Sequence, residues 1–299
     1  MLTRIGDLGQ NRRLTTTMLE LQSRSRVDQQ AVASGKAATS YAQIADRAGV
    51  LVRANDSRQI KAAFVERNEQ LMARMQAADS ALDGLVSIAE RARTLLVQRL
   101  DGAAGREVPL AAETEAMLAE VASKLNATFD GNYLFSGSRS GAPPVELPTP
   151  PITSADPTLY YQGDEVRVSS RIEEGAVLEH GVLASEAPFA QLIAALGLAG
   201  SAHAANDQAG LEAALSQVGE ALNGIVDVRS RHAVATARVE TVAESQRSAV
   251  LYLDEVIASI EDTDLPEVMA RLSRDQANLE AAYLVMGRLN SLSLIDYLR

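Results

Sequence analysis

The chain has 299 residues, of which 46% are apolar, enough for a sizeable core and against disorder over the whole length. Ala, Leu and Val dominate while aromatic residues are only 4%, a mix that suits thin helical seams. The net charge of −11, with no dense Lys/Arg block, argues against nucleic acid as a partner, and the lack of cysteine excludes disulfides and thiolate metal sites.

Residues 1–13 carry charges at Arg4, Asp7, Arg12 and Arg13, so they lack the apolar run of a Sec-type signal. No run of about 18 apolar residues is present in the sequence, and we therefore expect no membrane insertion.

A heptad stripe predicts a helix that begins near Ile60 and Phe64 and ends at the turn residues Asp101, Gly102 and Gly105. Its apolar positions alternate steps of four and three: Leu71, Met75, Ala78, Leu82, Leu85, Ala89, Ala92 and Leu96. Pro109 suits the first turn of a second helix, whose apolar set is Leu118, Val121, Leu125 and Phe129.

The middle of the chain has a different texture, because residues 137–157 hold six of the nine prolines and cannot be helical. Residues 159–161 and 166–168 are rich in β-formers and flank Gly163-Asp164, which predicts a β-hairpin. Ile172, Val177 and Leu178 indicate further strands. We expect a small β-rich insertion closed by a short helix from Pro188 to Leu198.

A second seam predicts one long helical rod over residues 211–260, roughly 75 Å in length. Fifteen positions keep the four-three rhythm and eleven of them are apolar: Leu211, Leu215, Val218, Leu222, Ile225, Arg229, His232, Thr236, Val239, Ala243, Gln246, Val250, Leu253, Ile257 and Ile260.

The last helix is predicted to follow a cap at Thr263 or Asp264, with Pro266 near its first turn. Leu265, Leu272, Leu279 and Met286 repeat at sevens, with Val268, Ala282 and Leu289 between them. Its final residues are apolar on more than one face: Leu289, Leu292, Leu294, Ile295 and Leu298. Such a surface gains nothing in water, so it indicates a partner.

No constellation of residues predicts catalysis, a cofactor or a metal. His180, His203 and His232 lack metal-ligand spacing, and the seam position of His232 favours a partly exposed structural histidine over a register-setting group or pH switch. The run around Gly35-Lys36 is not a phosphate-binding loop. The adjacent carboxylates of Glu173 and Glu174 point apart, which is typical of solvated charge.

Three segments carry a family resemblance. Residues 130–139, with Tyr133, Leu134, Phe135 and Gly137 as the most distinctive, resemble the segment by which the hook-associated protein 3 family leaves its core helices. Residues 78–93 and the turn at 34–36 resemble flagellin-type elements, and residues 283–298 resemble the flagellin-family terminus. Residues 37–46 lack the Asp-Asp-Pro that usually follows the turn.

The resemblance implies a mainly α fold in which long N- and C-terminal helices pair as a coiled coil or bundle, with a small β-rich inserted outer domain. We expect a terminal assembly domain at 1–40 and 262–299, a helical core rod at 41–136 and 200–261, and the outer domain at 137–199. The expected assembly interface comprises Leu8, Leu14, Met18, Leu21, Leu284, Leu289, Leu292, Leu294, Ile295 and Leu298.

The resemblance also implies a structural, non-enzymatic flagellar protein that joins hook to filament as a ring of subunits. Its expected partners are other copies, a hook-side junction protein, flagellin, the filament cap protein, the flagellar type III export apparatus and an export chaperone. Its expected location is extracellular, at the hook-filament junction, after export without signal cleavage. Flagellin itself is the alternative within this class, and a non-flagellar coiled-coil adaptor is the alternative outside it.

Overall fold

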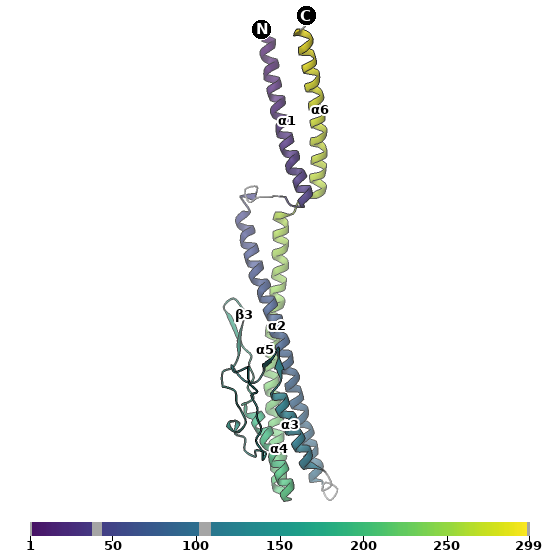
Figure 1. Cartoon of the computed structure of the whole chain (residues 1–299). Coiled ribbons are helices and arrows are strands. Elements are labelled where there is room, and N and C mark those ends of the chain that lie inside the picture. The colour runs from purple at the N-terminus through teal and green to yellow at the C-terminus, as the bar shows by residue number, and fades with distance from the viewer. Residues whose placement is uncertain (1, 38–43, 102–108, 298–299) are drawn as a thin grey trace. The chain divides into compact units, whose positions relative to one another are not determined.

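The computed structural model describes the backbone of residues 2–37, 44–101 and 109–297, and the side chains of 12–37, 44–101 and 109–288. Six α-helices dominate the described part (Figure 1). They are α1 (Leu2–Ser34), α2 (Ala48–Leu100), α3 (Leu110–Leu125), α4 (Ala187–Ala205), α5 (Gln208–Glu261) and α6 (Leu265–Tyr297). Short strands form two antiparallel pairs, β1 (Thr128–Phe129) with β2 (Asn132–Tyr133) and β3 (Ser169–Glu173) with β4 (Ala176–Glu179).

The chain divides into two compact units. The first, called the end unit here, comprises residues 1–60 and 249–299 and contains α1 paired with α6. The second, called the core unit, comprises residues 61–248 and contains most of α2 and α5, all of α3 and α4, and the strands. Helices α2 and α5 run through both units. The predicted mainly α fold with a small strand-containing region is confirmed.

Four helices pack on one another and enclose the hydrophobic core of the core unit. Its buried cluster takes Leu85 from α2, Val121 from α3, Phe189 from α4 and Ile225 from α5, all with 3% exposure or less. Helix α4 is apolar almost all round and is buried accordingly, as a helix in the middle of a core must be. The predicted helix after Pro188 is therefore present, but it is longer than expected and central to the packing.

The seam predicted along residues 211–260 is confirmed as the single helix α5 of 54 residues. In the N-terminal part of α5, however, some of the buried residues differ from those that were predicted. Ala214 and Ala221 are fully buried, whereas the predicted neighbours Leu215 and Leu222 are only half-buried. In this part α3 and α4 join the core, so the buried face of α5 widens beyond the two-helix seam.

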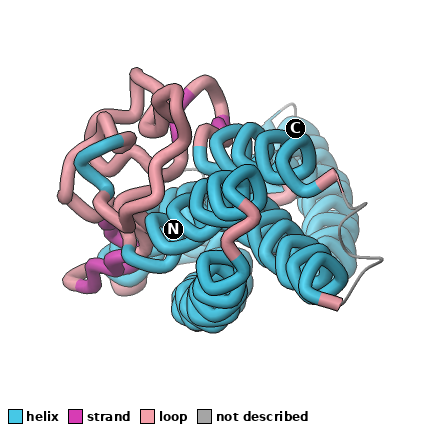
Figure 2. The backbone as a smooth tube through the Cα atoms, turned by 90° about the horizontal axis from the view of Figure 1, so that it is seen from below, coloured by secondary structure: helices cyan, strands magenta, loops and turns pink. Residues whose placement is uncertain are grey.

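The hairpin predicted around Gly163-Asp164 is wrong. Residues 157–159 form the short 3₁₀-helix η3, Tyr161 makes one isolated bridge with Val145, and residues 166–168 lie outside any strand. The hairpin is instead β3–β4, with the turn at Glu174-Gly175. Figure 2 shows the loops of residues 126–186 gathered on one side of the helices.

Aromatic side chains explain why the predicted hairpin does not form. Tyr160 is fully buried, and its hydroxyl donates a hydrogen bond of 2.8 Å to the carbonyl of Ala184. The Tyr161 hydroxyl turns back and donates to the Asp164 carbonyl at 2.7 Å. Burial of these rings in the core unit therefore outweighs the β-propensity of the segment.

The Tyr133–Gly137 segment is fastened by Asp164, an arrangement called the Gly137 clasp here. Gly137 has φ +72°, and a Cβ there would lie 2.2 Å from the Asp164 Oδ1 atom, so only glycine fits. The Asp164 carboxylate accepts hydrogen bonds from Ser138 N at 2.8 Å and from Val166 N at 3.1 Å. These bonds, with a further one from the Ser138 hydroxyl as the largest cause, lower the pKa of Asp164.

A buried amide pair holds the β3–β4 hairpin on the helices. Asn68 of α2 and Gln246 of α5 donate to the Ile172 carbonyl at 2.9 and 3.0 Å, and Asn68 also donates to Gln246 at 3.0 Å. Both amides are almost fully buried, as is Ile172 at 1% exposure. Because each buried amide is hydrogen-bonded, the hairpin is docked in one register rather than loosely attached.

Candidate assembly interface

Helices α1 and α6 form a thin antiparallel pair that carries most of the end unit. Met18, Leu21 and Ala31 of α1 and Val268 of α6 are buried between them. Three polar residues share this seam: Ser25, Asp28 and Asp275, each at 5 or 6% exposure. A seam with buried carboxylates gains less from apolar burial than the core unit does.

Ion pairs reach both buried carboxylates and, with one hydrogen bond, fix the register of the pair, although the Asp275 Oδ2 atom is buried without a hydrogen-bond partner among the described residues. Arg271 binds both oxygens of Asp28 at 3.0 to 3.3 Å, and this hydrogen bonding raises the pKa of Arg271. Arg24 lies 3.6 Å from the Asp275 carboxylate. Gln22 donates to the Tyr283 hydroxyl at 2.6 Å. The two helices are thus held in register by polar contacts rather than by a continuous apolar seam.

The turn after α1 is tied to the connection between α5 and α6. Gly35, at φ +70°, accepts a bond of 3.1 Å from Thr263 N, and Ala37 N donates to the Glu261 carbonyl at 2.7 Å. The Lys36 ammonium bonds the Glu261 carboxylate, which raises the pKa of Lys36. Asp264 caps α6 by accepting from Glu267 N at 3.1 Å, as its sequence position predicted.

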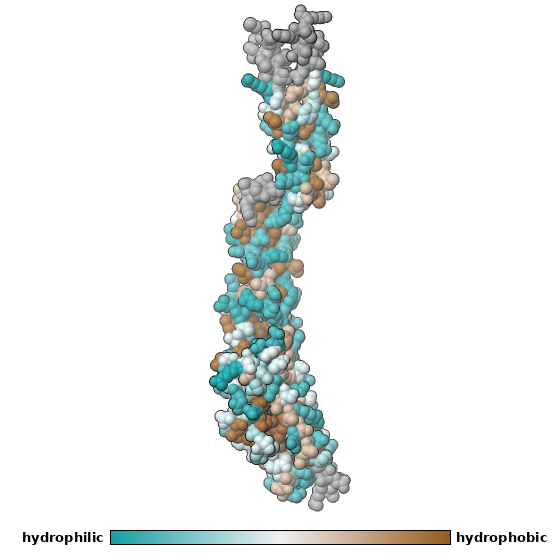
Figure 3. Space-filling view, in the orientation of Figure 1, coloured by the Kyte–Doolittle hydropathy of each residue, from teal (hydrophilic) through white to brown (hydrophobic). Residues whose placement is uncertain are grey.

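Large apolar side chains remain uncovered on the end unit. Leu19 on α1 is 61% exposed, and Met269 and Leu284 on α6 are 58% and 69% exposed. Figure 3 shows such apolar side chains interspersed with hydrophilic ones along the α1 and α6 pair. Exposed leucine and methionine on both helices leave surface that a partner could cover.

The structure places the predicted interface residues in three groups. Met18 and Leu21 are buried between α1 and α6, with Leu14 half-buried beside them. Leu284 points to solvent. The side chains of Leu8, Leu289, Leu292, Leu294, Ile295 and Leu298 lie outside the described residues, as does most of the 37–46 connection. The interface as a whole stays a prediction.

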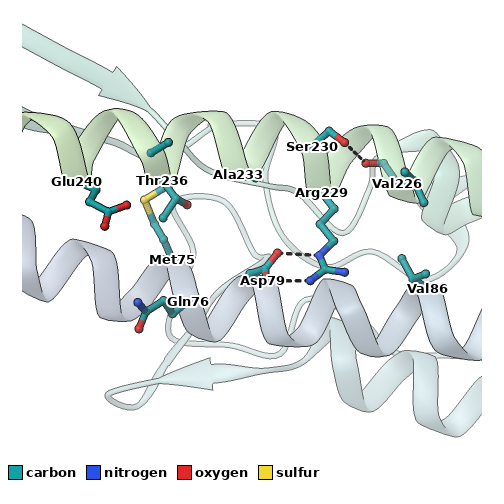
Figure 4. Close-up of a pocket in the computed structure, with 11 residues that line it drawn as sticks. Met75, Gln76, Asp79, Val86, Val226, Arg229, Ser230, Ala233, Thr236 and Glu240 are labelled. Carbon is teal, nitrogen blue, oxygen red and sulfur yellow. Dashed lines mark hydrogen bonds and ion pairs between the residues drawn. The ribbon is translucent and has the colours of Figure 1, made fainter.

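The role of Arg229 was not predicted from the sequence. Counted as a seam position, it lies at the edge of a groove of about 580 Å³ between α2 and α5, where it donates to Asp79 at 2.8 and 3.1 Å (Figure 4). It also bonds Asp83, and its hydrogen bond lowers the pKa of Asp79. The signal available in the sequence was the pair of carboxylates Asp79 and Asp83, which lie one helical turn apart, at i and i+4.

The described residues contain no group of three or more His, Asp or Glu side chains that could hold a metal, and none of the helices they form is long and apolar enough to cross a membrane. His232 is buried rather than partly exposed, with Nε2 2.9 Å from the Met75 carbonyl. His180 contacts the Ser170 hydroxyl and His203 accepts from Arg99 in α2, each histidine in a structural hydrogen bond.

Comparison with protein families gives two matches in the order of the chain. The model of the bacterial flagellin N-terminal helical region matches residues 8–140, and that of the bacterial flagellin C-terminal helical region matches residues 215–298. Together the two regions span well over half of the sequence, including the helical seams of both units. The chain belongs to the bacterial flagellin family.

Solved structures share the fold at low sequence identity. A Vibrio parahaemolyticus protein provisionally described as a flagellar hook-associated protein aligns over 74% of this chain and 100% of its own, with TM-score 0.61 and 13% identity. Bacillus cereus FlgL aligns over 70% and 99%, with TM-score 0.57 and 18% identity. Hook-associated protein 3 of Legionella pneumophila aligns over 71% and 98%, with TM-score 0.57 and 12% identity. A search of curated protein sequences gave no significant match.

Proposed function

We propose that this chain is a structural subunit of the bacterial flagellum that joins hook to filament, and that it has no catalytic role. The observation that carries the proposal is the fold shared with hook-associated proteins over nearly their whole length, in a chain of the flagellin family. The Gly137 clasp supports it, because it fastens the segment whose resemblance to hook-associated protein 3 separates this chain from flagellin.

Assembly is proposed to occur through the two terminal helices. A two-helix pair with buried carboxylates and exposed leucines is stabilised when neighbouring copies cover it, at about 25 cal/mol per Å² of apolar area. We assign residues 1–40 and 262–299 to this assembly domain, 41–136 and 200–261 to the rod, and 137–199 to the outward-facing domain. Leu284 and the apolar residues from Leu289 to Leu298 would contact other copies, while Met18 and Leu21 hold the pair together.

The proposed partners follow from this position. Copies of the chain would form a ring between a hook-side junction protein and flagellin, with the filament cap protein at an earlier stage of growth. Passage through the flagellar export apparatus, with an export chaperone, would deliver the chain to the cell exterior.

A strain lacking this chain tests the role. We expect completed hooks and flagellin released into the medium, because filament subunits would have no site of attachment. The matched control is complementation with the full-length chain, which should restore filaments. Normal filaments in a strain without a second gene copy would overturn the proposal.

Seeded polymerisation separates the junction role from the flagellin alternative. Purified chain mixed with filament fragments should add only a limited cap, since a junction subunit is not built for indefinite growth. Long filaments composed of this chain, seen by electron microscopy, would instead identify it as filament subunit.

Truncation tests the assembly surface. Removing residues 292–299 should block incorporation into flagella while the helical content of the core unit, followed by circular dichroism, stays intact. A truncated chain that still joins the flagellum would contradict the assigned interface.

A further inference from the structure

Three arginines gather in a cleft of the core unit that the proposed assembly does not use. The cleft has a volume of about 370 Å³ and is lined by Arg67 and Arg74 of α2 and Arg171 of β3, with Phe129 in its wall. Arg67 and Arg74 are seven residues apart, two turns along one face of α2. Asp130 is the one carboxylate among the residues that line it.

The charges of this arginine cleft are not neutralised within the chain. Among the described residues, no carboxylate lies within 4 Å of any of the three guanidinium groups, although ten other basic residues make ion pairs. Arg67 only donates to the Ala63 carbonyl at 3.3 Å and lies over the Phe64 ring. Arg74 is half-buried. In a chain of net charge −11, such a cluster fits carboxylate groups, which the guanidinium fork binds in a bidentate manner.

The same hairpin presents the complementary charge. Glu173 and Glu174 stand at the β3–β4 turn, both exposed, and neither has an ion pair with any described residue. The Asn68 and Gln246 amides hold Ile172, the residue just before them, so the acidic tip is presented in a fixed position. A preorganised group loses little freedom on binding. The tip does not pair with the cleft of its own chain, although Arg171 is only two residues from Glu173.

We propose that the acidic hairpin tip of one copy, Glu173 and Glu174, docks in the arginine cleft of a neighbouring copy. The inference rests on the proposed function, which brings copies side by side. Tip and cleft are different surfaces, so the contact is head-to-tail and repeats from copy to copy around a ring. An exposed ion pair changes an equilibrium constant by about fivefold at most, so this contact sets the register of copies already held by their terminal helices.

Cysteine cross-linking tests the contact cleanly because the natural chain has no cysteine. The full-length double variant Gln70→Cys, Glu174→Cys places one thiol at the cleft and one at the tip. In isolated hook-filament junctions, a short bismaleimide should give a ladder of multimers. The matched control pairs Gln70→Cys with Glu220→Cys, an exposed position on α5 away from the tip, and should give none.

Charge reversal tests the chemistry in the same double-cysteine chain. Since position 174 carries the thiol in this chain, the acidic tip is reversed at its remaining carboxylate: Glu173→Arg, or Arg67→Glu with Arg171→Glu, should each lower the ladder about tenfold by placing like charges together. Combining both reversals in one chain should restore it. Junctions that assemble normally but give no ladder, or a combined variant that stays defective, would overturn the docking and leave the proposed function standing. Failure of the double-cysteine and natural chains alike to join the flagellum would overturn both.

Discussion

The helices of the end unit and of the core unit share the same heptad spacing of apolar residues, yet the two units are stabilised differently. The core unit buries large apolar side chains from four helices and from the loop after β2, among them Leu85, Phe189 and the loop residue Phe135, all at 0% exposure. The α1 and α6 pair of the end unit buries Asp28 and Asp275 beside a few apolar residues such as Leu21, and leaves Leu284 in solvent. Periodicity therefore predicts that a helix packs against a partner, while the burial in the structure shows how much of its apolar surface the same chain covers.

This difference fits a protein that must be folded in one part and available for assembly in the other. Stability in a sealed core comes from apolar area and close packing. A pair of helices on its own offers little of either, and polar contacts such as Arg271 with Asp28 set its register without adding much free energy. Under the proposed function, the end unit would be stabilised most when other copies cover it.

Matched leucine truncations should break this comparison most strongly. Leu85→Ala in the core unit should lower the free energy of unfolding by about 3 to 4 kcal/mol, because the cavity is enclosed on all sides. Leu21→Ala in the α1 and α6 pair should leave the unfolding of the core unit unchanged and instead weaken incorporation into flagella. Urea denaturation followed by circular dichroism measures the first effect. Equal losses of core-unit stability in both variants would contradict the division.

Substitutions at two glycines of the core unit distinguish the cost of a strained backbone from the cost of a clash with Asp164 in the Gly137 clasp. Gly137→Ala places a methyl group against Asp164 at a left-handed φ, so we expect a loss of about 2 to 3 kcal/mol in the free energy of unfolding. Gly175→Ala has a similar φ of +78° but no atom within 4 Å, so it should cost only about 1 kcal/mol. Thermal melts of both variants measure the difference, and equal shifts would show that Asp164 contributes nothing.

The helices could be predicted from sequence because their information is local. The α5 seam, the Asp264 cap and the stop of α2 at Leu100 all follow from residue spacing and turn chemistry. The α5 stripe was displaced because α3 and α4 pack on it, and a single-helix pattern carries no record of additional neighbours.

The strands expected around Ile172, Val177 and Leu178 are present as β3 and β4. The conformation of residues 133–168 could not be predicted, because it depends on contacts distant in sequence. The ring of Tyr160 is buried against a carbonyl 24 residues away, and Asp164 fastens a turn 26 residues upstream. The same holds for Arg229, whose carboxylate partner Asp79 is 150 residues distant. The heptad spacing predicted that Arg229 lies within the seam, but the charged side chain lies at the edge of that seam.

Replacing polar contacts in the end unit sharpens the comparison further. Asp28→Leu alone should lower the stability of the α1 and α6 pair by about 1 to 2 kcal/mol, since it removes the bidentate partner of Arg271. The double variant Asp28→Leu, Arg271→Leu should be neutral or stabilising because apolar contact replaces a buried ion pair. Hydrogen exchange of the α1 amides measures both. A double variant less stable than the single one would show that the ion pair is itself the main stabiliser.

The smallest expected effect is a pH dependence confined to the core unit. Burial, with Arg74 and His232 nearby, lowers the pKa of His180 to about 4. The unfolded chain binds this proton near pH 6.5, so stability should fall by about 1 kcal/mol as the pH drops from 6.5 to 4, after allowance for solvent screening. His180→Gln should flatten that part of the stability curve. Ser170→Ala, which removes only the hydroxyl contact of the imidazole, should retain the slope because burial is the larger cause. A slope unchanged in His180→Gln would assign the acid sensitivity to other groups.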